Sequence, residues 1–125
     1  MALGAEVWQA SGTGEVRAIG ARLDTALVGR LRAVVRGAPT TESELRRLRA
    51  GADGWRRALE AQVEGSEGRL RDLAARRAPR LALVTAELRR LDRLRPQLDE
   101  VDRLLFDLER RARELRASWL QAGDS

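Results

Sequence analysis

Apolar residues recur at alternating steps of three and four along the last third of the chain. The alternation is unbroken from Leu91 to Trp119, which places these side chains on one face of a long helix, as in a coiled-coil seam. Pro96 lies within this stretch, and because the heptad phase persists past it, we expect a kink rather than a loop. The residues predicted to form a partner-binding seam are Leu91, Leu94, Leu98, Val101, Leu105, Leu108, Leu115 and Trp119.

The seam belongs to the last of three predicted helices, which cover residues 15–36, 42–77 and 79–120. The first helix stops at the Gly37–Thr40 segment, which combines Gly and Pro. Thr41 and Glu44 have the spacing of a capping box at the start of the second helix. Leu81, Val84 and Leu88 are expected to begin the seam of the third helix. Residues 1–14 and 121–125 are predicted to be tails around a single domain of residues 15–120.

Two glycine pairs, at positions 51/54 and 65/68, interrupt the apolar pattern of the second helix. Their separation of fourteen residues equals two heptads, which fits either a duplicated unit or chance matching in a repetitive sequence. Glycine weakens a helix, so the pairs either soften this helix locally or divide it into shorter pieces. The sequence leaves both alternatives open.

Composition favours the same fold class. Aromatic residues make up 3% of the chain and hydrophobic residues 43%, and a chain rich in Ala, Leu, Arg and Glu is typical of long helices and coiled coils. We therefore predict an all-α fold, an elongated antiparallel helical hairpin turning near Pro79, with an additional N-terminal helix beside it. Trp55 and Trp119 lie on apolar stripes and are expected to anchor a core or an interface, whereas Trp8 lies outside any periodic segment and its role stays open.

The sequence offers little for catalysis. It contains no Cys, His or Lys, so the common ligands of zinc, haem and iron–sulfur clusters and the commonest general base are missing. Carboxylates at positions 99, 100, 102 and 107 lie on the heptad helix among arginines, without a sign of the water-excluded cleft that acid–base catalysis needs. We expect no enzymatic activity, no cofactor, no metal site and no small-molecule substrate.

The net charge of +5 raises the possibility of nucleic-acid binding. Residues 1–40, 41–78 and 79–125 carry +2, +2 and +1, and acids alternate with arginines throughout, as on a solvated helix. A nucleic-acid-associated basic protein is therefore the alternative and not the first hypothesis.

Nothing in the sequence predicts a signal peptide or a membrane span. Residues 1–10 lack a basic segment followed by an apolar one. The longest strongly apolar run, residues 81–84, is far short of the roughly 20 residues that cross a bilayer. We expect a cytoplasmic protein without disulfides that does not insert into membranes.

Three short elements of the third helix carry a resemblance to a known family: Pro79-x-Leu81, Glu87-Leu88-Arg89-x-Leu91 and Val101-Asp102-Arg103-Leu104. Together they resemble the helical core of small coiled-coil subunits in the complexes that build lysosome-related organelles and position lysosomes, with the last element displaced along the helix. The resemblance covers about 35 residues and implies a cytosolic scaffold subunit at an organelle surface.

The sequence thus predicts a structural or adaptor subunit that assembles into a larger complex through coiled-coil pairing. Unburied apolar seam on an elongated hairpin would be the contact surface. Different protein partners are expected rather than copies of the same chain.

Overall fold

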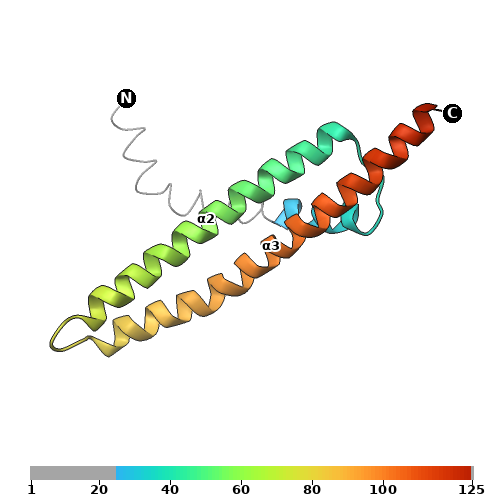
Figure 1. Ribbon diagram of the computed structural model, residues 1–125. Helices are drawn as coiled ribbons and strands as arrows, with labels where there is room; N and C mark the ends of the chain where they lie inside the picture. Colours follow the sequence, from blue (N-terminus) through green and yellow to red (C-terminus); the bar gives the residue numbers. More distant parts are fainter. Residues whose placement is uncertain (1–24, 125) are drawn as a thin grey trace, which may run out of the picture.

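The computed structural model describes residues 25–124, which form three helices and contain no strand (Figure 1). A short helix covers residues 25–35, α2 runs over Glu42–Ala74 and α3 over Leu81–Asp124. The two long helices pack against each other as an antiparallel hairpin, with the short helix beside them. This confirms the predicted all-α hairpin with an additional N-terminal helix.

The helix bounds differ somewhat from those predicted. α2 ends three residues earlier than expected, and α3 begins at Leu81 and continues to Asp124 rather than ending at 120. Pro79 lies in the turn between them. The predicted N-terminal tail, Trp8 and the first ten residues of the predicted first helix lie outside the described residues.

The connection between the short helix and α2 follows established capping geometry. Gly37 has a φ of 113°, a left-handed conformation that glycine adopts without steric cost. Its N–H donates to Val34 O at 3.1 Å, and the N–H of Ala38 donates to Ala33 O at 2.9 Å. These two bonds form a Schellman motif, which satisfies carbonyls at the helix end. Pro39 then prevents the helix from continuing.

α2 begins with half of the predicted capping box. Thr41 is the N-cap, in extended conformation, and its hydroxyl accepts a hydrogen bond from Glu44 N at 3.1 Å. The Glu44 carboxylate does not bond back to the cap. It accepts instead from the Arg30 guanidinium at 2.5 and 3.0 Å and from the Thr40 hydroxyl at 2.6 Å. Glu44, expected to complete the capping box, thus joins α2 to the short helix instead.

Both long helices are continuous in spite of their helix-breaking residues. α2 passes through both glycine pairs, so they do not divide it. At one of them the backbone allows a close approach, since a Cβ on Gly51 would lie 3.1 Å from Leu27 Cδ1 of the short helix. α3 passes through Pro96, and beside it Gln97 Nε2 donates to Arg93 O at 3.1 Å. The expected absence of a loop at Pro96 is confirmed.

The core runs the length of the hairpin, and the short helix widens it at one end. Leu31 and Val34 of the short helix are fully buried, and Arg32 pairs with Glu100 of α3. Trp55 is partly buried against this core, as expected for an anchor. The buried apolar residues of the long helices are Leu45, Leu48, Ala52, Leu59, Val63, Leu73, Leu91, Leu94, Val101, Leu104, Leu105, Leu108 and Ala112.

Candidate partner-binding surfaces

The predicted seam of α3 faces mainly the chain's own helices. Five of its eight residues are buried: Leu91, Leu94, Val101, Leu105 and Leu108. Leu98 and Leu115 are partly buried and pack against the same core. A partner could reach the five buried side chains only by displacing α2 or the short helix. The eighth, Trp119, is 38% exposed.

Trp119 is exposed because α2 does not extend that far. Glu42, the first residue of α2, pairs with Arg116 at 2.8 Å. Beyond this pair, residues 117–124 of α3 have no facing α2 segment, and we call them the overhang. Trp119 and Leu120, which is 72% exposed, are its large apolar side chains. α3 therefore continues past the helix that covers it, as its red end in Figure 1 illustrates.

A ladder of ion pairs between α2 and α3 follows one flank of the hairpin. Its pairs are Glu42–Arg116 at 2.8 Å, Arg49–Glu109 at 3.1 Å, Arg56–Asp102 at 2.5 Å and Glu67–Arg95 at 3.8 Å. The α3 members are spaced by seven residues, so they occupy one heptad position. These side chains are 38–58% exposed, and exposed pairs contribute only about 0–1 kcal/mol each. The ladder therefore favours this register and orientation more than it adds stability.

The same heptad position changes chemistry toward the turn of the hairpin. Seven and fourteen residues before Arg95 it is occupied by Leu88 and Leu81, which are 49% and 76% exposed. The sequence-based assignment of these two leucines to the seam was wrong. Counting back from Leu91 in strict alternation leads to Glu87 and Val84, and these are the residues that are partly buried. The signal was present, but an apolar residue at 88 was preferred to a carboxylate at 87.

Glu87 is accepted in the seam because α2 supplies it with donors. The Ser66 hydroxyl, which is fully buried, donates to Glu87 Oε2 at 2.6 Å. Arg69 Nε donates to Glu87 Oε1 at 2.7 Å. The bond from Arg69, followed by that from Ser66, lowers the pKa of the Glu87 carboxyl. The sequence pattern gave no sign of this polar cluster.

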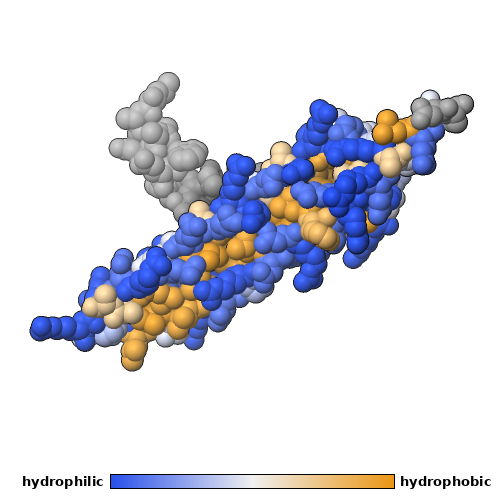
Figure 2. Space-filling model, in the orientation of Figure 1, coloured by the Kyte–Doolittle hydropathy of each residue, from blue (hydrophilic) through white to orange (hydrophobic). Residues whose placement is uncertain are grey.

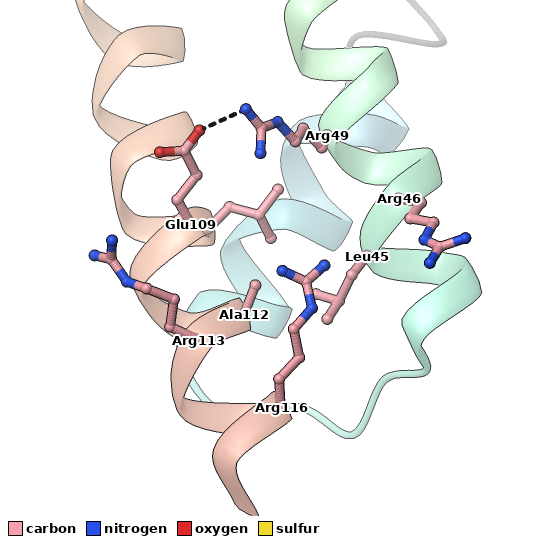
Figure 3. Close-up of a pocket in the computed structure, with 8 residues that line it drawn as sticks. Leu45, Arg46, Arg49, Glu109, Ala112, Arg113 and Arg116 are labelled. Atoms are coloured by element: carbon pink, nitrogen blue, oxygen red, sulfur yellow. Dashed lines mark ion pairs between the residues drawn. The ribbon is translucent and has the colours of Figure 1, made fainter. Parts of the chain in front are cut away.

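A shallow groove of about 350 Å³ lies between the start of α2 and the second half of α3 (Figure 3). Its apolar residues are Leu45, Leu108 and Ala112, and its rim carries four arginines and Glu109. Two of these arginines already have carboxylate partners in the ladder, Arg49 with Glu109 and Arg116 with Glu42. The groove lies beside the ladder, and most of its guanidinium groups already pair with carboxylates of the hairpin.

The carboxylates considered for catalysis lie on α3 and are exposed or partly buried. Asp102 pairs with Arg56, and Glu100 pairs with Arg32. Over residues 25–124 there is no group of three or more acidic, Cys or His side chains arranged to hold a metal ion. No helix in this range is long and apolar enough to span a bilayer.

Comparison of the chain with known protein families, with curated proteins and with solved structures gave no match.

Proposed function

We propose that this chain is a non-enzymatic adaptor subunit that joins a larger complex by helix pairing at the overhang of α3. The observation that carries the proposal is the mismatch in length between the seam and α2. Trp119 continues the 3,4 alternation of the buried seam, yet its side chain is 38% exposed because α2 begins opposite Arg116. A seam that extends beyond the helix covering it within the chain can pack against a second helix.

The chemistry of the site defines the partner. An apolar stripe at heptad spacing packs against another such stripe, so the partner would be an amphipathic helix that lies antiparallel to α3, in line with α2. Trp119 and Leu120 supply a large apolar surface of the kind that dominates interface energetics. We place the complex in the cytoplasm as part of the same proposal, since the chain has no cysteine for an oxidising compartment.

Replacing Trp119 and Leu120 tests the proposal. The tagged full chain and the Trp119→Asp/Leu120→Asp variant are purified from native cells, and the sizes of the complexes are compared by sedimentation. We expect the wild type to sediment in a larger assembly and the variant to be released from it, because an aspartate in a helix seam leaves a charge buried without a partner. The matched control is Phe106→Asp, a change at another exposed apolar residue of α3, 63% exposed, outside the overhang.

A photo-crosslinking residue at position 120 identifies what occupies the site. Crosslinks to an amphipathic helix of a different protein support the proposal. Crosslinks to a second copy of this chain would show that the overhang forms a homo-oligomer and not a heteromeric complex. If Phe106→Asp dissolves the assembly and the overhang variant does not, the contact lies elsewhere on α3 and the proposal is wrong.

A further inference from the structure

The turn end of the hairpin gathers most of the excess positive charge of the molecule. We define the hairpin tip as residues 69–90, the last turns of α2, the connecting turn and the first turns of α3. Its acids are Asp72 and Glu87, and its arginines are Arg69, Arg71, Arg76, Arg77, Arg80, Arg89 and Arg90. The tip therefore carries +5, which equals the net charge of the whole chain. By contrast, residues 91–124 hold seven arginines and eight acids.

The charge of the tip is not neutralised within the hairpin. Along the ladder each arginine has a carboxylate partner, but of the seven tip arginines only Arg69 forms an ion pair within residues 25–124. Arg76, Arg77 and Arg80 lie in or beside the connecting turn and are exposed. Exposed positive charges without counter-charges in the chain attract anions, so the tip is the part of the hairpin best suited to meet an anion.

Exposed leucines accompany these arginines. Leu81 and Leu88 take the heptad position that carries charged residues along the ladder, and Leu83 on the first turn of α3 is 43% exposed. In Figure 2 the tip, at the lower left of the view, shows apolar residues bordered by hydrophilic ones. Exposed leucines and arginines without ion-pair partners are thus found together at the tip.

We propose that the hairpin tip docks on an anionic membrane surface, a role separate from helix pairing at the opposite end. The arginines would contact lipid phosphates, each contributing attraction near an anionic leaflet, and the leucines would enter the boundary between headgroups and acyl chains. Leu81 and Leu120 are carried by the same helix, roughly 60 Å apart at 1.5 Å per residue. The chain would then hold a membrane at one end and a protein helix at the other.

The composition of the tip favours a membrane over a protein partner. Six of its seven arginines form no ion pair within residues 25–124, and its leucines are exposed next to them in the sequence. A bilayer needs no complementary groove, and its phosphates supply the missing counter-charge. Nucleic acid would also neutralise the arginines, but its phosphate backbone leaves exposed leucines without a role.

Vesicle co-sedimentation of the full chain tests the proposal. The vesicles contain either phosphatidylcholine alone or phosphatidylcholine with about one third phosphatidylserine, at ~0.1 M salt, where the Debye length is about 10 Å. We expect binding to the anionic vesicles only. The variant Arg76→Gln/Arg77→Gln/Arg80→Gln should bind ten- to roughly a hundredfold more weakly, given the contribution of each arginine near an anionic surface. Leu81→Gln/Leu88→Gln should also weaken binding several-fold.

Two matched controls separate the tip from net charge and from general apolarity. Arg57→Gln/Arg103→Gln/Arg110→Gln removes three exposed arginines outside the tip, and Phe106→Gln removes an exposed apolar residue elsewhere. Both should bind anionic vesicles like the wild type, and circular dichroism should show all variants equally helical. Absence of binding to anionic vesicles, equal binding to neutral ones, or equal losses in both arginine triples would each overturn the proposal. So would displacement from the vesicles by equimolar duplex DNA, which would identify nucleic acid as the preferred ligand.

Discussion

Arg116 donates two hydrogen bonds to the carboxylate of Glu42, from Nε at 2.9 Å and from Nη2 at 2.8 Å. This bidentate pair joins the first residue of α2 to the last part of α3 that has α2 beside it. Its hydrogen bonds, chiefly those from Arg116, lower the pKa of the Glu42 carboxyl. The pair marks the end of the ladder and so the point at which the seam of α3 becomes available to a partner.

Acid should weaken the tie between the short helix and α2. The hydrogen bonds from Arg30, followed by that from Thr40, lower the pKa of Glu44 from 4.5 to about 2. A carboxyl with a depressed pKa stabilises the fold fully above its unfolded pKa, near 4.5, and loses this contribution as the pH falls toward 2. The difference in melting temperature between wild type and Glu44→Gln should therefore be constant above pH 5 and close between about pH 4.5 and 2.

The control for this pH series is Glu64→Gln, at an exposed carboxylate without an ion pair in the described structure. Its melting temperature should follow that of the wild type at every pH. A gap between wild type and Glu44→Gln that stays open down to pH 2 would contradict the role assigned to the Arg30–Glu44 bond.

Glycines 51 and 54 should respond differently to the same substitution. Alanine is better than glycine in a helix interior by about 0.8–1 kcal/mol, and a Cβ at Gly54 would meet nothing within 4 Å. Gly54→Ala should stabilise the protein by up to that amount. Gly51→Ala should stabilise it less or not at all, since its Cβ would lie 3.1 Å from Leu27 Cδ1. Urea unfolding measures both, and equal gains would mean that the short helix does not approach α2 as described.

Ser66 should be worth more to stability than an exposed serine. Ser66→Ala removes the buried hydroxyl that donates to Glu87, and a hydrogen bond of this kind contributes about 0.5–1.5 kcal/mol. Ser118→Ala makes the same change at an exposed position of α3, so both variants gain the same helix propensity. The free energy of unfolding of Ser66→Ala should be lower than that of Ser118→Ala by about 1 kcal/mol. Equal values would show that the Ser66–Glu87 hydrogen bond does not stabilise the fold.

Leu108 should matter for folding before it matters for assembly. It is 2% exposed, and a buried Leu→Ala change costs about 2–5 kcal/mol. Phe106→Ala, two residues earlier on the exposed face, should stay within about 0.5 kcal/mol of the wild type. Chemical denaturation of the two variants checks this, and a Leu108→Ala protein as stable as the wild type would show that α2 does not cover the seam. Loss of a partner in Leu108 variants would therefore reflect unfolding.

Periodicity was a reliable guide to the helices. The alternation from Leu91 to Trp119, the capping pattern at Thr41 and the Gly37–Thr40 stop all corresponded to observed structure, because each depends on residues within a few positions of one another. Whether the glycine pairs divide α2 could not be predicted from periodicity. Packing of α2 against two other helices outweighs glycine's weak helix propensity, and that packing is invisible along the chain.

Charge was misjudged for a different reason. Dividing the sequence between residues 78 and 79 split a cluster that is contiguous along the chain, with Arg76 and Arg77 on one side and Arg80 on the other. The sequence identified Trp119 as a seam residue but could not show that it lies beyond the segment of α3 that α2 covers.

The sequence by itself determined which segments are helical and which face of each is apolar, since backbone hydrogen bonding and side-chain spacing are local properties. Only the tertiary structure decided which parts of those faces are buried. That depends on the register of α2 against α3, which the bonds of Ser66 to Glu87 and of Arg116 to Glu42 favour, between residues 21 and 74 positions apart. The register buries most of the seam and leaves the overhang and the hairpin tip exposed.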